Sequence, residues 1–251
     1  MVDRAGVSGA IKRRYGVELR AQWLEQCAAH IEQELGGARQ REHLEAQVRL
    51  VVEQLVHAEI GDACHPSLAV DGATGQVRVL AGRPGTLLQV QSVVDVGVSK
   101  HSMWEAARET EDFEQRGIRP SYLPQAAADE GDSGAGFAGT AAEAEEEAAA
   151  DLEAAGGRQP RIPRKLLKLE LTDGRARVAA LEVARIEQLS ASMPIGTKVL
   201  VSGGQLLPGS GVLCLRPGDI HVVGGAPPQY AQHTLRARMA GLLGRGSERN
   251  A

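Results

Sequence analysis

Two glycine-containing stretches have the spacing of known chemical motifs. Gly134-Ala-Gly136-Phe-Ala-Gly139 matches the GxGxxG pattern that holds a dinucleotide pyrophosphate, and the overlapping Gly-Asp-Ser-Gly of residues 131–134 has the form of a loop around a serine nucleophile. The dinucleotide motif requires a buried strand directly before it, and the preceding QAAADEGDS is not strand-like. A serine nucleophile requires an oriented histidine and oxyanion donors, which an acidic low-complexity tract cannot hold in place. We expect neither chemistry.

Cysteine and histidine pairs are the candidates for metal binding. Cys27 and His30 are three residues apart and Cys64 is next to His65, but neither spacing is that of a zinc module. Cys27 also falls on the apolar face of a predicted helix, where packing explains it. With Cys214 the cysteines number three, without a CxxC pattern, which predicts reduced thiols. We therefore predict no metal and no cofactor, and the lack of a Walker or HExxH motif argues against an enzyme.

Charge is distributed unevenly along the 251 residues. Residues 125–157 hold nine acidic and no basic residues, so removing this −9 from the net charge of −4 leaves about +5 for the rest of the chain. Mild positive charge permits contact with nucleic acid without requiring it. Neither a signal-peptide core nor an apolar run long enough to span a membrane occurs, so we expect a soluble intracellular protein without a membrane or small-molecule partner.

The N-terminal third has helical periodicity. Trp23, Cys27, Ile31 and Leu35 recur every fourth residue within 19–35, and Gly36-Gly37 follows. A second helix is expected over 41–58, and a shorter one over 8–15. These segments predict a small helical bundle.

The remainder changes to β-structure. The predicted strands are residues 86–96, 165–171, 175–183, 195–202 and 211–215, with 220–223 extending the last pairing. Thr172-Asp-Gly174 joins the second and third strands, and Asp-Gly between alternating apolar residues is a strong hairpin signal. Five short strands favour a small closed barrel, followed by a helix within 229–243.

A barrel of the OB type often binds single-stranded nucleic acid by stacking bases on aromatic side chains. None of the two Phe, two Trp and three Tyr residues falls in a predicted strand. Autonomous binding therefore stays a minor alternative, with weak phosphate contacts expected from Lys165, Lys168, Arg175 and Arg177. An aliphatic barrel surface is better suited to a protein partner.

Several stretches together resemble the RecQ-mediated genome instability protein 1 family. The similarity extends from about residue 8 to residue 243, outside the middle of the insert, and is specific as a combination although each motif alone is weak. The stretches are Trp-Leu-Glu-Gln-Cys (23–27), His65-Pro66, Ser-Val-Val-Asp-Val (92–96), Arg-Lys-Leu-Leu-Lys-Leu-Glu-Leu-Thr-Asp-Gly (164–174), Ala-Leu-Glu (180–182), Pro-Ile-Gly-Thr-Lys-Val (194–199) and Val-Val-Gly-Gly (222–225).

The resemblance implies an α+β fold: an N-terminal helical bundle (1–63), a five-stranded OB-fold β-barrel (64–226) and a C-terminal helix and tail (227–251). Residues 97–163 form a long insert between the first two barrel strands, which we expect to be partly disordered in its acidic half. In such proteins the insert engages the gate of a type IA topoisomerase. The implied function is that of a nuclear, non-catalytic subunit of a complex of RecQ (Bloom-type) helicase and topoisomerase III, which dissolves double Holliday junctions and contacts DNA mainly through the complex.

The expected topoisomerase interface has two parts. Lys198, with its neighbour Thr197, belongs to the Pro-x-Gly-Thr-Lys stretch, and the alternative for Lys198 is an ordinary solvated lysine at a strand edge. The first half of the insert contains apolar and aromatic residues without a core of their own, which either contact the partner or fold back on the barrel: Met103, Trp104, Phe113, Ile118, Tyr122 and Leu123.

Two alternatives remain from the sequence. One is an OB-fold adaptor of the Tudor-domain type, which partners the other form of topoisomerase III; Ser-Val-Val-Asp-Val favours the first family, and no Tudor module follows in this chain. The other is an autonomous single-stranded nucleic-acid-binding module, which would show affinity that falls steeply with salt.

Overall fold

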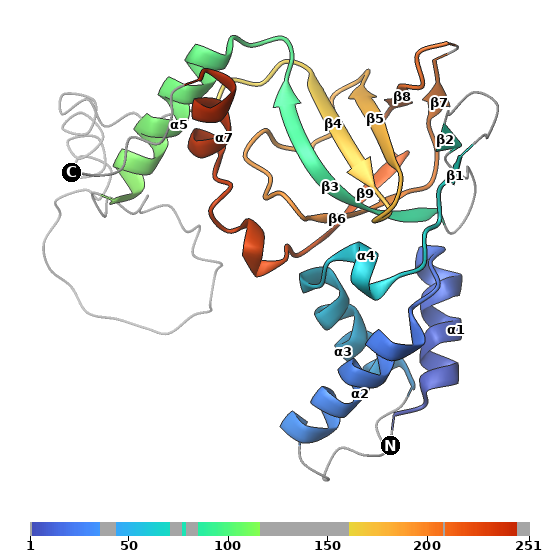
Figure 1. Cartoon of the computed structure of the whole chain (residues 1–251). Coiled ribbons are helices and arrows are strands. Elements are labelled where there is room, and N and C mark those ends of the chain that lie inside the picture. Colours follow the sequence, from blue (N-terminus) through green and yellow to red (C-terminus); the bar gives the residue numbers. More distant parts are fainter. Residues whose placement is uncertain are drawn as a thin grey trace, which may run out of the picture.

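The computed structural model describes residues 2–35, 44–70, 77–78, 85–115, 161–207 and 209–244. These residues form two hydrophobic cores, one among the N-terminal helices and one inside a curled β-sheet, and the helices lie below the sheet in Figure 1. The predicted acidic half of the insert lies outside the described residues.

Within the described residues of the N-terminal part the helices are α1 (Arg4–Tyr15), α2 (Ala21–Leu35), α3 (Leu44–His57) and α4 (Ile60–Ala63). Helix α1 begins earlier than predicted because the Asp3 side chain caps it, accepting from the backbone N–H of Gly6 at 2.9 Å. Gly16, at φ +67°, ends it in the left-handed conformation that favours glycine. The helices pack through Val7, Ile11, Leu24, Cys27, Ile31, Val48, Val51 and Leu55.

A single seven-stranded sheet has the order β7-β8-β5-β4-β3-β6-β9, and a separate ribbon pairs β1 with β2. All pairs in the seven-stranded sheet are antiparallel except β5 with β8. The strands are β1 (Ala69–Val70), β2 (Val77–Arg78), β3 (Thr86–Asp95), β4 (Leu167–Thr172), β5 (Arg177–Glu182), β6 (Lys198–Val201), β7 (Gln205–Leu206), β8 (Leu213–Leu215) and β9 (Ile220–Gly224).

The sheet has seven strands and not the predicted five, because the hairpin formed by residues 198–224 bends in the middle. Gly204, between β6 and β7, has φ +118°, and Gly218, between β8 and β9, has φ +94°. Both arms of the hairpin are therefore interrupted at the same position along its length. The backbone N–H groups of Ser202 and Gly203 both donate to the Asp219 carbonyl there. The halves next to the bend pair separately, β6 with β9 and β7 with β8. Both ends of the sheet thus belong to one bent hairpin, which accounts for the curl.

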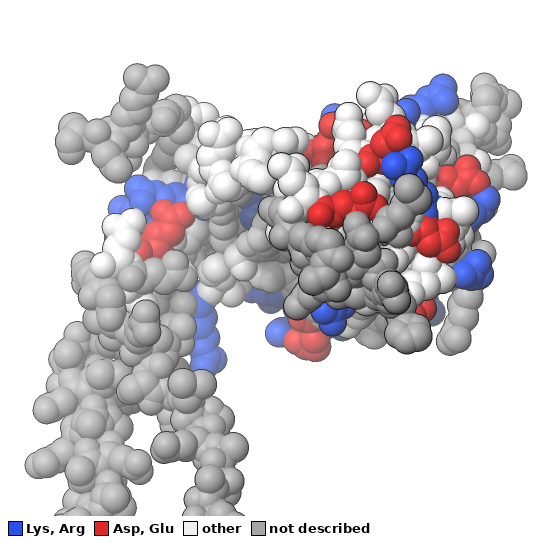
Figure 2. Space-filling model, turned by 90° about the horizontal axis from the view of Figure 1, so that it is seen from below, with Lys and Arg blue, Asp and Glu red and all other residues white. Residues whose placement is uncertain are grey.

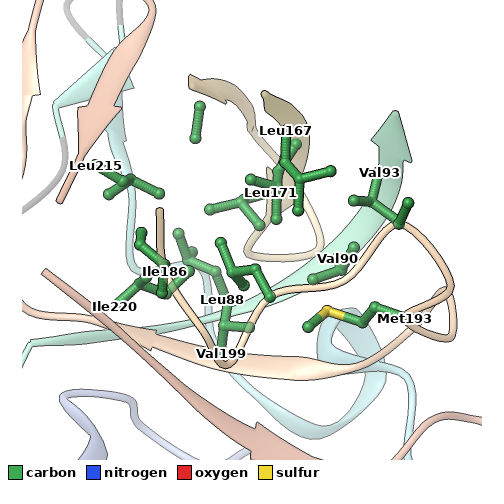
Figure 3. Packing of buried hydrophobic residues seen from close by; sticks show 14 of the residues in the cluster. Leu88, Val90, Val93, Leu167, Leu171, Ile186, Met193, Val199, Leu215 and Ile220 are labelled. Atoms are coloured by element: carbon green, nitrogen blue, oxygen red, sulfur yellow. The ribbon is translucent and has the colours of Figure 1, made fainter. Parts of the chain in front are cut away.

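The interior of the sheet is aliphatic. Along β4, Leu167, Leu169 and Leu171 are fully buried while Lys168 and Glu170 are exposed, as the period of a strand requires. In Figure 3, Leu167 and Leu171 converge with Leu88, Val90, Val199, Leu215 and Ile220 from neighbouring strands. Leu169 belongs to the same cluster. This alternation of buried and exposed residues fixes the register of β4 against its neighbouring strands, because a shift by one residue would expose every leucine of β4.

The predicted Asp-Gly hairpin is present, and Asp173 joins it to the linker after α4. The buried carboxylate accepts from four backbone N–H groups, those of Ser67, Leu68, Arg175 and Ala176, at 2.7 to 2.9 Å. Burial alone would raise the pKa of Asp173, but these four donors outweigh it and hold that pKa below its ordinary value. Asp173 therefore ties the hairpin to the linker that follows α4.

No helix or strand was predicted for residues 100–115, in the first half of the insert. They form helix α5 (Lys100–Gln115), which packs against the C-terminal helix α7 (Leu235–Leu242) beside one end of the sheet (Figure 1). A short 3₁₀ turn, η2 (Pro228–Tyr230), precedes α7. Leu235 and Met239 of α7 belong to the core of the sheet, so this helix is part of the sheet domain.

Candidate protein-binding groove at the base of the insert

The two ends of the insert are held together by Asp95, the last residue of β3. Its buried carboxylate accepts from the backbone N–H of Gly97 (2.8 Å) on the outgoing side and of Lys165 (2.5 Å) and Leu166 (3.3 Å) on the returning side. A Cβ at Gly97 would lie 2.8 Å from the Lys165 Cβ, so the close approach requires glycine there. The insert therefore starts and ends at one fixed point.

A second buried carboxylate, Glu182 of β5, secures the returning end. It forms an ion pair with Arg164 (2.5 Å), whose side chain is 13% exposed, and accepts from the backbone N–H groups of Leu167 (3.3 Å) and Ile186. Arg164 also donates to the Ile186 carbonyl at 2.8 Å. Charged groups removed from water are stable only when paired in this way.

Helices α5 and α7 form a platform next to this point. Met103 and Ala107 are buried against the sheet core, and Glu111 forms an ion pair with Arg236 of α7 at 3.3 Å. Arg238 donates to the carbonyls of Val93 (3.0 Å) and Ala191 (2.8 Å), which fastens α7 to the sheet. Burial lowers the pKa of Arg238 to about 10, so it stays charged at neutral pH.

A groove of about 430 Å³ lies between this platform and the segment before α7. Its walls are mostly apolar, and the T-shaped ring pair of Tyr230 and His233 has a centroid distance of 5.6 Å. The lining residues are Ala107, Thr110, Glu111, Ile162, Ser192, Pro194, Ala226, Pro227, Pro228, Tyr230, Ala231, His233, Thr234 and Leu235. Its titratable residues are Glu111, which is in an ion pair, Tyr230 and His233. Because the walls are otherwise mostly apolar, the groove is suited to binding apolar side chains.

The predicted interface residues of the insert lie partly at this groove. Trp104 is partly buried against the sheet core, and the Arg108 guanidinium lies 5.3 Å from the centroid of its ring. Phe113 is half-buried near the end of α5, one turn from the groove residues Thr110 and Glu111. Met103 and Trp104 therefore pack on the sheet core. Ile118, Tyr122 and Leu123 lie outside the described residues.

Lys198 and Thr197 are both buried, so neither alternative that the sequence left for Lys198 describes it. The side chain is 0% exposed, and β6 pairs with β3 on one side and β9 on the other, which excludes a solvated strand edge. Its Nζ donates to the carbonyls of Gly196 (2.9 Å) and Val56 (3.3 Å), near the end of α3. Burial lowers the pKa of Lys198 to about 8, opposed by the negative charge of Glu59. Lys198 therefore joins the sheet to the helices from inside and does not form part of a surface.

This burial predicts a pH dependence that Lys198→Met removes. The unfolded chain keeps the lysine proton up to pH 10 or so, whereas the folded chain releases it near pH 8, so this group makes folding more favourable as pH rises between the two values. The free energy of unfolding of the wild type should rise relative to Lys198→Met by up to about 3 kcal/mol across this window. Denaturant titrations at several pH values measure it.

The comparison with Lys198→Met is necessary because two cysteines titrate in the same range. Burial raises the pKa of Cys27 to about 11 and that of Cys64 to about 12, which lowers stability as pH rises. The Cys27 thiol is unaffected by Lys198 and cancels in the difference. The Lys198 charge lowers the pKa of Cys64, so the two proteins are compared with Cys64→Ala in both of them. A difference that stays flat between pH 7.5 and 10.5 would show that the ammonium is not desolvated.

The four predicted phosphate contacts do not form a strong site. Lys165, Lys168, Arg175 and Arg177 are exposed, but Glu170 lies on the same face of β4 as Lys168, and no described strand contains an aromatic residue. Figure 2 shows acidic and basic side chains interspersed over the described part of the face seen from below. This arrangement is typical of a solvated surface and not of a nucleic-acid track.

Other chemistry receives no support within the described ranges. No group of three or more His, Cys, Asp or Glu side chains is arranged to hold a metal ion there. None of the helices described is long and apolar enough to cross a membrane. Cys27 and Cys64 are buried in the helical core, as their apolar neighbours suggested.

The groove was not predicted because one of its walls, helix α5, was not predicted. The helix had a readable signal: the Ser99 hydroxyl accepts from the backbone N–H of Ser102 at 3.0 Å, and Met103 and Ala107 follow at helical spacing. The polar residues between them hid this pattern. The other wall, residues 226–235, has no local signature of a groove.

The curled sheet, with its strand order and its parallel pairing of β5 with β8, places the protein in the OB-fold class. An apolar groove lies beside it, between α5, α7 and the segment before α7. The chain belongs to the family described as RMI1, N-terminal OB-fold domain, whose model matches residues 67–238. This confirms the family to which the sequence motifs pointed.

Known relatives carry the name RecQ-mediated genome instability protein 1. The protein of Gallus gallus is 25% identical over 245 residues, which cover 94% of this chain and 33% of that protein, and the protein of Danio rerio is 25% identical over 235 residues, 93% of this chain and 38% of that protein. The protein of Mus musculus is 38% identical over 85 residues, 32% of this chain and 14% of that protein. The chain thus spans only about a third of the length of the Gallus gallus and Danio rerio proteins.

Proposed function

We propose that this protein is a non-catalytic adaptor of a nuclear complex of RecQ helicase and topoisomerase III, in which it promotes double Holliday junction dissolution and decatenation. Membership of the RMI1 family and the name of the relatives support a role in genome stability. The observation that carries the adaptor role is the apolar groove at the base of the insert. A mostly apolar groove without a reactive pair is suited to a protein ligand.

In this proposal the insert and the groove contact the same partner, a type IA topoisomerase. The insert leaves the platform at the end of α5 and returns at Arg161, next to the groove residue Ile162. A topoisomerase bound by the insert is thereby brought to the groove. The helical bundle (1–63), the OB barrel (64–226) and the tail (227–251) would act as one unit, with DNA contacted mainly through the complex.

The test is binding of the chain to topoisomerase III, followed by a decatenation assay. Deleting residues 101–160 would remove the buried Met103 and Ala107, so the deletion should span 119–158, bridged by a short Gly-Ser linker. We expect the full chain to bind and stimulate, and the deletion variant to keep its melting temperature but stimulate less. Absence of binding by the full chain, or unchanged stimulation by the variant, would contradict the adaptor role.

A single-stranded DNA-binding module is the second candidate, favoured only by the exposed Lys165, Lys168, Arg175 and Arg177. Oligonucleotide affinity of the isolated chain, measured at several salt concentrations, distinguishes it: steep salt dependence supports the module, and weak binding supports the adaptor. An adaptor of the Tudor-domain type would instead prefer the other form of topoisomerase III, so both forms belong in the binding assay.

A further inference from the structure

One wall of the groove rests on the N-terminal helices. This wall is the connecting segment, residues 225–230, which runs from β9 through η2 and contributes Ala226, Pro227, Pro228 and Tyr230 to the groove. At its start Gly225 has φ +66°, and a Cβ there would lie 2.5 Å from the Val56 Cβ and 2.6 Å from the Val56 carbonyl oxygen. The connecting segment is therefore in direct contact with the end of α3.

The connecting segment also packs tightly on the sheet. Gly196 has φ +90°, and a Cβ at this position would lie 2.5 Å from the Pro227 Cδ and 2.8 Å from the Tyr230 Cδ2. Beneath it, the Lys198 Nζ joins the carbonyls of Gly196 and Val56. The end of α3, the start of β6 and the connecting segment thus meet at one joint.

Glu59, in the corner between α3 and α4, links the parts of this joint with its two carboxylate oxygens. Gln89 Nε2, from the fully buried side chain in β3, donates to Oε1 at 2.7 Å, and Gln229 Nε2, from the connecting segment, donates to Oε2 at 3.1 Å. Gln89 in turn accepts from the backbone N–H of Ile60 at 3.0 Å. A second polar contact joins the His57 Nδ1 and the Ala226 carbonyl oxygen at 3.2 Å.

We infer that Glu59 is a positioning residue for the groove: it holds the connecting segment against the helices and so sets the position of one groove wall. The N-terminal helices would then act as a buttress for partner binding, in addition to any contact of their own. A carboxylate suits this task because each oxygen accepts a hydrogen bond from a different amide, and hydrogen bonds to a charged acceptor are stronger than neutral ones. The expected effect of Glu59 on topoisomerase binding rests on the proposed function, whereas its expected effect on the position of the connecting segment does not.

The test combines Glu59→Ala, Gln229→Ala and the double variant in the full chain. The amides to follow by hydrogen exchange are those of Tyr230 and Ala231, which donate to the Pro227 and Pro228 carbonyls. Each single variant should speed their exchange roughly tenfold while leaving the amides of β4 and β5 unchanged. Topoisomerase III affinity should fall about fivefold, and the double variant should be no weaker than Glu59→Ala, because both substitutions break the same bond.

Glu53→Ala is the matched control, since Glu53 is an exposed residue of α3 whose contact is a surface ion pair with Arg49. It should change neither exchange nor affinity. Gln229→Ala guards against misfolding, because Gln229 is exposed and its loss removes one hydrogen bond to Glu59. Unchanged exchange in both single variants, or additive losses of affinity, would overturn the inference. Faster exchange in a protein whose wild type binds no topoisomerase would instead refute the proposed function alone.

Discussion

Replacing Ala231 with arginine is expected to lower the affinity for topoisomerase III at least about 30-fold without unfolding the protein. Ala231 is exposed and lines the groove directly after η2. Its backbone N–H donates to the Pro228 carbonyl at 3.0 Å, which the substitution preserves. A guanidinium in this position would occupy the space of an apolar partner side chain, and it would lose its water when the partner binds. The substitution therefore weakens binding both by steric exclusion and by the cost of desolvating a charge.

Ala237→Arg provides the matched control. Ala237 is also exposed, but it lies on α7 outside the groove lining, and its structural contact is the backbone N–H that donates to Thr234 Oγ1. This variant should bind within twofold of the wild type, as measured by biolayer interferometry, with a melting temperature equal to that of Ala231→Arg. Equal affinities for both variants would place the partner elsewhere on the molecule.

Glu182→Ala should have the largest effect on folding, a loss of about 4 kcal/mol in the free energy of unfolding. The substitution leaves the Arg164 guanidinium, whose side chain is only 13% exposed, without its carboxylate. The Nε of Arg164 already has no hydrogen-bond partner, and without Glu182 the guanidinium keeps only its hydrogen bond to the Ile186 carbonyl. The backbone N–H groups of Leu167 and Ile186 lose their acceptor as well. Denaturant titration near neutral pH measures the loss.

Two comparisons test the cause of that loss. Glu187→Ala removes an exposed ion pair with Arg185, whose side chains are 76% and 65% exposed, and should cost less than about 1 kcal/mol. The double variant Arg164→Leu with Glu182→Leu removes both charges and should recover much of the stability, because no buried charge is then left unpaired. If the double variant is as unstable as Glu182→Ala, the lost backbone contacts and not the buried charge are responsible.

Local patterns predicted the parts of the fold whose burial repeats along the chain. The alternation of apolar and polar residues in 165–183, with its Asp-Gly turn, predicted β4 and β5 to within two residues at each end. It did so because buried and exposed side chains alternate along a strand. The apolar repeat of 19–35 gave α2 in the same way. The strands at 195–202, 211–215 and 220–223 were predicted, but β7 (Gln205–Leu206) was not, because a glycine such as Gly204 permits a bend between two strands without requiring one.

The sequence by itself determined the family, the helix-then-sheet order and the aliphatic core, since these depend on residue types and short spacings. Only the tertiary structure decided that Lys198 is buried, that α5 packs on α7, and that residues 107–111, 162, 192–194 and 226–235 surround one groove. The reason is physical: a lysine looks the same in a sequence whether water or the Val56 and Gly196 carbonyls surround its Nζ. A groove, likewise, is made by segments far apart in the chain, and no local pattern records which of them meet.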